Sequence, residues 1–282
     1  MSAFGQFQGF FENGAAMNRI VRSSAAICCL ILSGGVAALA DEPIKLIAHR
    51  GGVVEGQLAE NTLPALQAAM DRGYWMVEVD VQESKDGHAV VHHDRDFRRF
   101  YDVPRLLAEM TWDEIRNLRT KSGNARPLDF DEFTAACRGR MRLMVDTKGP
   151  DHPPEFYRAM ERALVENDLL RTAYFIGTAE SKAYFQGKAR ISVDRGQLKE
   201  ALERGEDVGR LYFLFEHGRV LDEATVGLAR QAGVPVVPSV NVFHYLGRDH
   251  MEAAGADIRR LRMLEVTQYQ IDSVYERFCR DE

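Results

Sequence analysis

The chain of 282 residues is poor in several features that would place it in a specialised class. It has 4 cysteines, of which only Cys137 and Cys279 lie beyond the first 40 residues, so no disulfide framework is indicated and we expect free thiols. Lysine and arginine (36) are outnumbered by aspartate and glutamate (42), which argues against a nucleic-acid-binding surface. No apolar run after residue 40 is long enough to cross a membrane, and no linker or repeat interrupts the chain.

The first 40 residues have the pattern of an export signal. Arg19 and Arg22 precede an apolar stretch at 25–36, and an Ala-Leu-Ala tripeptide follows before the acidic Asp41. This order of charge, apolar run and small residues is typical of a secretory signal. We therefore predict a signal peptide at 1–40, with Met17 as an alternative start, and a secreted or periplasmic protein. An uncleaved anchor or a buried helix is the alternative interpretation.

Apolar runs and amphipathic segments alternate along residues 41–282, which indicates βα repetition around a parallel sheet. The length suits one α/β domain, a TIM (β/α)8 barrel of typically about 250 residues. Nine strand candidates are one too many, and we expect 190–193 or 210–215 to lie outside the barrel. The connection from Asp80 to Ala89 is too short for a crossover helix, so we expect distortion around strands 2 and 3. The candidates are 44–49, 76–81, 89–93, 141–146, 173–177, 190–193, 210–215, 234–238 and 267–271.

The ionisable residues that suggest chemistry are concentrated between residues 47 and 94. Glu78 and Asp80 are two apart in the strand VEVDV, so both carboxylates project from the same side of it. His49 and His93 each end an apolar run, and strand ends are where α/β barrels place their reactive groups. The neighbouring His92 should face the other way.

A third carboxylate, Asp146, ends another apolar run and is expected from across the barrel. With Glu78 and Asp80 it makes an oxygen-only ligand set that suits one divalent cation, Mg²⁺ or Ca²⁺, better than Zn²⁺. Lys148 lies two residues beyond Asp146 and, with Arg50, is placed to bind phosphate oxygens. His49 and His93 beside such a cluster fit a general base and a general acid. The other histidines, His88, His152, His217, His244 and His250, are expected to be solvated.

The order of short motifs in this chain resembles the glycerophosphodiester phosphodiesterase family: HRG at 49–51, ENT at 60–62, E-x-D at 78–80 and DG-x-x-VV-x-HD at 86–94. Farther along, Asp146-Thr147-Lys148 stands in the place of the family's Glu-x-Lys, and Val240-Asn241 resembles the end of its Trp-Thr-Val-Asn segment. The resemblance implies a TIM barrel in which His49 and His93 are catalytic and Asn241 joins the substrate-binding residues. It also selects His93 over His92.

Three polar residues are expected to support the reactive groups. Glu60 and Asn61 open the first helix, where we expect them to cap it and to orient His49 or Arg50. Asp94 stands beside His93 and should orient it.

Two departures from the family pattern concern the pocket. Asp146 is one methylene shorter than the usual glutamate, and Pro238-Ser239 replaces a Trp-Thr pair, which removes an aromatic wall. A lipid substrate, the alternative to a small diester, would favour an apolar rim, for which the candidates are Phe97, Phe100, Tyr101, Phe243 and Tyr245.

These observations predict a metal-dependent hydrolase that cleaves small glycerophosphodiesters into glycerol 3-phosphate and an alcohol. The alternatives are a phosphoinositide or lyso-phospholipid phosphodiesterase of the same fold, and a non-catalytic protein that binds phosphodiesters. The presence of both histidines argues against the last, because binding needs no acid–base pair. We expect no nucleic-acid partner and no membrane span once the signal is removed; the sequence does not give the oligomeric state.

Overall fold

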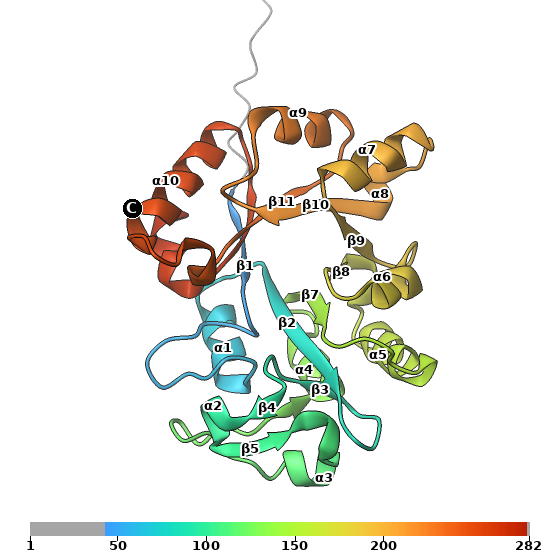
Figure 1. Cartoon of the computed structure of the whole chain (residues 1–282), viewed down its shortest axis with the longest axis vertical. Coiled ribbons are helices and arrows are strands. Elements are labelled where there is room, and N and C mark those ends of the chain that lie inside the picture. The colour runs from blue at the N-terminus through green and yellow to red at the C-terminus, as the bar shows by residue number, and fades with distance from the viewer. Residues whose placement is uncertain (1–42, 281–282) are drawn as a thin grey trace, which may run out of the picture. The chain divides into compact units, whose positions relative to one another are not determined.

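The computed structural model describes residues 43–280, so the predicted signal peptide lies outside the described residues. Parallel strands form a closed ring, because β1 pairs with β12 on one side and with β2 on the other (Figure 1). The TIM (β/α)8 prediction is therefore confirmed. The eight strands of the ring are β1 (Lys45–Ala48), β2 (Met76–Glu83), β7 (Arg142–Thr147), β8 (Tyr174–Phe175), β9 (Arg190–Val193), β10 (Tyr212–His217), β11 (Val236–Val240) and β12 (Gln268–Ile271).

The strand candidate outside the ring is 89–93, which forms β3 (Ala89–Val91) and pairs antiparallel with the end of β2. The expectation that 190–193 or 210–215 would be the extra strand is wrong, since these form β9 and β10. A short link joins antiparallel neighbours but cannot return a chain to a parallel one. The distortion expected near strands 2 and 3 is thus a hairpin formed by the end of β2 and β3. Strand β6 (Leu128–Asp129) pairs antiparallel with the other edge of β3.

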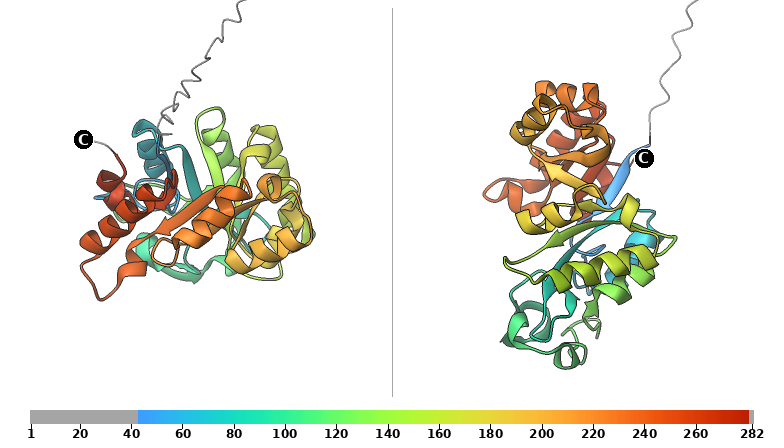
Figure 2. Two further views of the ribbon diagram at one scale, coloured as in Figure 1. Left: turned by 90° about the horizontal axis from the view of Figure 1, so that it is seen from above. Right: turned by 90° about the vertical axis from the view of Figure 1, so that its right-hand side faces the viewer.

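Helices surround the ring of strands (Figures 1 and 2). The α-helices are α1 (Leu63–Asp71), α2 (Arg98–Tyr101), α3 (Trp112–Ile115), α4 (Phe130–Cys137), α5 (Pro154–Glu166), α6 (Ala179–Phe185), α7 (Arg195–Glu203), α8 (Val208–Leu211), α9 (Glu223–Gln231) and α10 (His250–Met263). The 3₁₀ helices of the described residues are η1 (Leu107–Glu109), η2 (Leu170–Thr172), η3 (Val242–Tyr245) and η4 (Ser273–Phe278). In the described part of the chain no helix is long and apolar enough to cross a bilayer.

Strand β2 shows how the pattern of residues positions the site. Val77 and Val79 face outward and pack in the large core between strands and helices. Met76 faces inward and belongs to the small apolar cluster that fills the barrel interior. Because side chains alternate, Glu78 and Asp80 continue this inward row above Met76, toward the mouth. An apolar plug therefore closes the barrel below the two carboxylates.

A separate apolar cluster anchors the hairpin and the segment after it. Phe97 and Tyr101 are buried in this cluster. Phe97 belongs to β4 (Asp96–Phe97), which pairs with β5 (Val103–Leu106). Tyr245 is also buried, so the expectation that these three side chains form an apolar rim is wrong. Phe243, half of whose surface is exposed, is the rim residue that the structure leaves open.

The two cysteines of the described region are free and buried, as expected. Burial raises the pKa of each thiol, Cys137 and Cys279, to about 12.

Candidate active site

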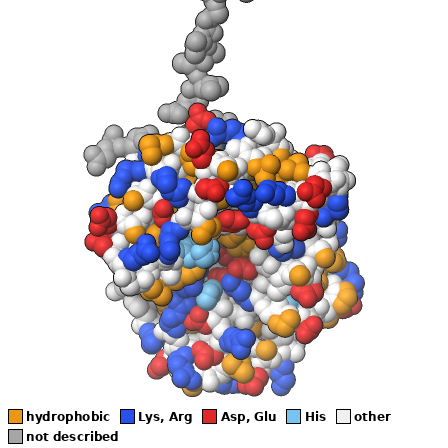
Figure 3. All heavy atoms as spheres, turned by 45° about the horizontal axis from the view of Figure 1, so that its top comes forward, with side chains coloured by type: hydrophobic (Ala, Val, Ile, Leu, Met, Phe, Trp, Pro, Cys, Tyr) orange, Lys and Arg blue, Asp and Glu red, His pale blue; other side chains and the backbone are white. Residues whose placement is uncertain are grey.

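A cavity of about 310 Å³ opens at the carboxyl ends of the barrel strands. The space-filling view shows a hollow there, with acidic side chains inside it and histidines beside it (Figure 3). The predicted site residues that line the cavity are His49, Arg50, Glu78, His93, Asp146, Lys148 and Asn241. Residues spread over 193 positions of the sequence thus share one surface.

Three carboxylates form the floor of the site. Glu78 and Asp80 are each 1% exposed, and Asp146 pairs in register with Asp80 on the neighbouring strand β7. One oxygen of each lies within 4.8 Å of the others, close enough to share an ion. Asp146 is therefore a neighbour of Asp80, and the expectation that it reaches the site from across the barrel is wrong. β2 pairs with β7 because the intervening hairpin leaves the ring.

The charges in this group are unbalanced. Burial, followed by the charges of Asp80 and Asp146, raises the pKa of Glu78 well above its usual value. Burial also raises the pKa of Asp146. Burial opposes ionisation of Asp80 as well, but Lys148 and then His93 outweigh it and lower its pKa. One ammonium thus faces three carboxylates, two of them buried, and this excess of negative charge suits a divalent, oxygen-liganded cation.

Lys148 lies among these carboxylates. Its Nζ is 3.0 Å from Asp80 Oδ1 and donates a hydrogen bond to Asp146 Oδ2. Its pKa is raised because these carboxylates outweigh the burial of the ammonium. Lys148 also lines the cavity, so it neutralises the floor and presents positive charge to a ligand.

The HRG motif forms a tight turn over the carboxylates. Arg50 adopts a left-handed backbone with φ 54° and donates its N–H to Glu78 Oε2 at 2.7 Å. Gly51 has φ 76°, and a Cβ there would lie 2.5 Å from Asn61 Cα. Only glycine fits this position, because both the conformation and the close approach exclude a side chain.

The ENT motif supports the site but does not cap the helix. Glu60 accepts a hydrogen bond from Arg50 Nη1 at 3.2 Å, as expected for an orienting group. Asn61 donates to Asp80 Oδ2 at 2.8 Å. Helix α1 has Thr62 at its N-cap and no side-chain cap, so the capping predicted for Glu60 and Asn61 is wrong. Asn61 has φ 55°, in the left-handed region of backbone conformation.

Both predicted catalytic histidines are held by a carboxylate through Nδ1. His49 Nδ1 is 2.6 Å from Asp272 Oδ1, and its Nε2 is 4.0 Å from Glu78 Oε2. His93 Nδ1 is 2.8 Å from Asp94 Oδ1. In each ring this arrangement places the Nδ1 proton toward the carboxylate and leaves Nε2 for chemistry.

His93 is part of a closed ring of hydrogen bonds. Its Nε2 is 3.1 Å from Arg50 Nη2, so the arginine donates and Nε2 accepts. Arg99, on α2, donates to both oxygens of Asp94, at 2.6 Å and 2.9 Å. The same guanidinium donates to Glu60, which in turn binds Arg50. Glu60, His93 and Asp94 also lie close enough to hold a metal, but two guanidinium groups already neutralise these carboxylates, and the group does not fit one.

The opposite wall of the cavity was not predicted. Glu216 and His217 line it from the end of β10, and His244 from η3. His217 is exposed, as expected, whereas His244 is half-buried, and the two rings stack with their centroids 3.8 Å apart. Burial, followed by the charge of His217, lowers the pKa of His244 to about 4. The available signal was their position, since Glu216 and His217 end strand β10 and His244 lies shortly after β11.

Asn241, on the same wall of the cavity, has a side-chain donor without a partner. It is 1% exposed, lines the cavity, and its Nδ2 is buried without a hydrogen-bond partner. A buried donor left unpaired is costly, which indicates that a ligand supplies the acceptor.

The remaining histidines of the mouth region are structural. His92 is buried, hydrogen-bonded to the Asp96 carbonyl at 2.9 Å and stacked on Phe97, as its opposite orientation predicted. The expectation that His152 is solvated is wrong, because its Nδ1 lies 2.9 Å from Glu83 Oε2 and its ring stacks on Phe156.

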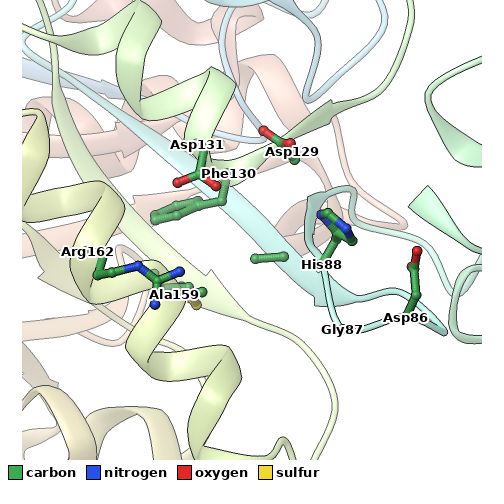
Figure 4. Close-up of a pocket in the computed structure, with 10 residues that line it drawn as sticks. Asp86, Gly87, His88, Asp129, Phe130, Asp131, Ala159 and Arg162 are labelled. Atoms are coloured by element: carbon green, nitrogen blue, oxygen red, sulfur yellow. The ribbon is translucent and has the colours of Figure 1, made fainter. Parts of the chain in front are cut away.

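A second cavity of about 210 Å³ lies away from the mouth, between the β2–β3 loop and helices α4 and α5 (Figure 4). Asp86 and His88 face Asp131 and Arg162 across it. Asp86 already accepts hydrogen bonds from Ser84 Oγ and the Trp112 N–H, so it holds the hairpin in place.

Both the sequence motifs and the fold of this chain are similar to those of known proteins. Residues 49–169 match the model of the Glycerophosphoryl diester phosphodiesterase family. Over this segment the chain is similar to the members of that family. Glycerophosphodiester phosphodiesterase 1 of Homo sapiens is 32% identical over 39% of this chain and 35% of its own length. A probable glycerophosphodiester phosphodiesterase 2 of Mycobacterium tuberculosis is 28% identical over 72% of this chain and 76% of its own.

Solved structures of the glycerophosphodiester phosphodiesterase family have the same fold. A putative member from Galdieria sulphuraria aligns with TM-score 0.65 at 16% identity, over 84% of this chain and 96% of that one. A phosphodiesterase of Oleispira antarctica, solved with the product sn-glycerol-3-phosphate, aligns with TM-score 0.63 at 20% identity, over 83% and 96%. The chain spans about a third of the length of the first curated relatives it matches, 32% to 35%.

Proposed function

We propose that this protein is a metal-dependent hydrolase that cleaves glycerophosphodiesters into glycerol 3-phosphate and an alcohol. The observation that carries the proposal is the cavity itself. It combines an oxygen-only carboxylate group, two cationic side chains and two carboxylate-held imidazoles on one surface.

Glu78, Asp80 and Asp146 are the proposed ligands of one divalent cation, Mg²⁺ or Ca²⁺. When bound, such an ion supplies charge neutralisation to a phosphodiester, which otherwise repels nucleophiles. Asn61 fixes the orientation of Asp80, and the Arg50 N–H fixes that of Glu78.

Arg50 and Lys148 are the proposed phosphate-binding residues. The guanidinium of Arg50 stands between Glu60 and His93, from which its planar donors can reach two oxygens of one phosphate. Lys148 adds a point charge from the floor. Asn241 offers its unpartnered Nδ2 to a substrate oxygen.

His49 and His93 divide the proton transfers. Asp272 stabilises a proton on His49, whose Nε2 points toward Glu78, so His49 is placed to act as the general base. His93 is assigned as the general acid: Asp94 supports its protonated form, and when Arg50 turns its Nη2 from Nε2 to the phosphate, Nε2 can carry the proton that goes to the leaving alkoxide. The proposed route therefore needs both rings.

Glycerol 3-phosphate as a product is supported by the Oleispira neighbour, which was solved with it. The lipid alternative is weaker, since three of its five expected rim residues, Phe97, Tyr101 and Tyr245, are buried. The non-catalytic alternative leaves the two histidine–carboxylate pairs without a purpose.

Turnover of sn-glycero-3-phosphocholine tests the proposal. Purified protein should release glycerol 3-phosphate in the presence of Mg²⁺ or Ca²⁺ and lose this activity in EDTA. Release of phosphocholine and glycerol, or full activity in EDTA, would overturn it.

We also propose that residues 1–40 direct export of the protein from the cytoplasm. Cell fractionation with antibodies should then find the mature chain outside the cytoplasm. Finding the full-length chain in the cytoplasm would contradict this.

A further inference from the structure

We propose that Gln82 is a positioning residue for His93: its side-chain amide holds residues 92–94, the segment that carries this ring into the site. The inference rests on the proposed function, because His93 is the general acid of that proposal. Gln82 is not among the residues that line the cavity, so it acts through the backbone of His93 and not on the substrate.

The amide nitrogen of Gln82 is surrounded by three consecutive backbone carbonyls. Its Nε2 lies 2.8 Å from the oxygen of His92, 3.1 Å from that of His93 and 2.7 Å from that of Asp94. Carbonyl oxygens only accept hydrogen bonds, so the end of the amide that faces them is the nitrogen, which has two hydrogens to donate. A single side chain thus gathers the backbone of the whole segment.

The segment needs such a donor because it lies beyond the sheet. Strand β3 ends at Val91, and the next backbone bond to β2 runs from the His92 N–H to the Asp80 oxygen, at 3.0 Å. After this bond the chain leaves the strand, and the three carbonyls take the Gln82 amide as their donor. Carbonyls without a donor are costly where water is excluded, so the contact stabilises this path of the chain.

The position of Gln82 in β2 explains how it reaches the segment. Gln82 lies two residues beyond Asp80, on the same face of the strand by alternation. It also lies one residue beyond Val81, the last residue of β2 that pairs with β7. The strand that carries the carboxylates of Glu78 and Asp80 therefore also sets where His93 stands relative to them.

The side-chain contacts of His93 do not replace this support. Asp94 Oδ1 contacts the ring at Nδ1, and Arg99 donates to Asp94. His93 and Asp94 nevertheless share the backbone that Gln82 holds, so the ring and its carboxylate move together if that backbone moves. Such a shift takes Nε2 away from the leaving oxygen, and a misplacement of about 1 Å can lower the rate by about 10²-fold.

The competing interpretation is that Gln82 only stabilises the hairpin of β2 and β3. The leaving group separates the two roles, because a general acid assists an alkoxide but hardly a nitrophenolate, which leaves without a proton. A less stable hairpin would instead reduce the amount of active protein and lower the turnover of both kinds of substrate by the same factor.

The experiment measures kcat of the wild-type protein and of Gln82→Met on sn-glycero-3-phosphocholine and on the glycerophosphodiester of 4-nitrophenol. Methionine is unbranched like glutamine but has no donor. We expect a loss of about tenfold or more on the choline substrate and of less than about threefold on the nitrophenyl substrate. Gln67→Met, at a half-buried glutamine of α1 that donates to Asp71 at 2.6 Å, is the matched control and should change neither.

The double variant Gln82→Met/His93→Ala gives a second readout. A residue that acts only through His93 has no further effect once the ring is gone. On the choline substrate, the double variant should therefore match His93→Ala within about twofold. Gln82→Glu, which has the shape of glutamine but no donor when ionised, repeats both comparisons if Gln82→Met folds poorly.

Three results would overturn the inference and leave the proposed function standing. They are equal losses on the two substrates, no loss on either, and a double variant whose loss is the product of the two single losses. A wild-type protein that cleaves neither substrate overturns both the inference and the proposed function.

Discussion

The two halves of the barrel mouth are built differently. On the side of β1, β2 and β7, nearly every charged group has a partner: Asp80 is held by Asn61, and Asp94 by Arg99. On the side of β10, β11 and β12, groups stand open to the cavity, among them the Asn241 amide and the Phe243 ring. A partnered network fixes geometry, and an open wall is completed by a ligand.

This difference predicts two kinds of variant. Changes on the partnered side should lower the turnover of every substrate alike, because they act on the phosphate that all substrates share. Changes on the open side should alter the ranking of substrates. Among variants on the partnered side, Glu78→Gln should have the largest effect and Asp94→Asn the smallest.

Glu78→Gln should have the largest effect. It removes a central negative ligand, so kcat should fall roughly 10³-fold or more on every glycerophosphodiester, and metal binding by titration calorimetry should weaken with it. Asp131→Asn, at the cavity away from the mouth, is the control and should behave as wild type. If Glu78→Gln keeps full, EDTA-resistant activity, the carboxylates serve only the structure.

His49→Ala and His93→Ala should each lower kcat by about 10²-fold to 10⁴-fold, the range for a positioned proton donor or acceptor. Metal affinity should change little, because neither ring belongs to the carboxylate group. The loss in His93→Ala should be milder on a nitrophenyl ester, whose leaving group needs no proton. Equal losses on good and poor leaving groups would remove the general-acid assignment.

Arg99→Ala should have an intermediate effect on kcat, roughly tenfold, since it frees Asp94 and so loosens His93. Its neighbour Arg98 is largely exposed and only 3.9 Å from Asp96, so Arg98→Ala is a matched control with near wild-type activity. Indistinguishable kinetics of the two variants would show that the hydrogen-bonded ring around His93 does not position it.

Asp94→Asn should show the smallest effect, on stability as a function of pH. Burial opposes ionisation of Asp94, but hydrogen bonds from Arg99 and His93 outweigh it and lower its pKa to about 2. A lowered folded-state pKa gives stability that is present above the unfolded value, near 4, and is lost as pH falls toward 2. The difference in Tm between the wild-type protein and Asp94→Asn should therefore become smaller as the pH falls from about 4 to about 2. A gap that stays constant from pH 6 to pH 2 contradicts the assignment.

The sequence predicted the partnered side well because local rules determine it. Alternation along β2 predicted that Glu78 and Asp80 share a face, and strand ends predicted the place of His49. The place of Asp146 was misjudged, because strand order around the ring depends on whether a hairpin stays in the sheet, which is a property of long-range pairing. The role of Asn61 was missed for a similar reason, since its partner Asp80 lies 19 residues away.

The open side was predicted poorly. The strand expected at 210–215 continues to His217, and this extension carries Glu216 and His217 into the cavity. The contact of Asp272 with His49, 223 residues away in the sequence, depends on the closure of the barrel between β12 and β1. Periodicity gives a residue's face and not its distant partner.

The most direct test of the central claim is the position of the ion. A crystal of the protein soaked in Mn²⁺ should show one anomalous peak at the mouth, within about 2.6 Å of oxygens from Glu78, Asp80 and Asp146. A peak among Glu60, His93 and Asp94 instead, or none at a concentration of Mn²⁺ that supports full turnover, would contradict it.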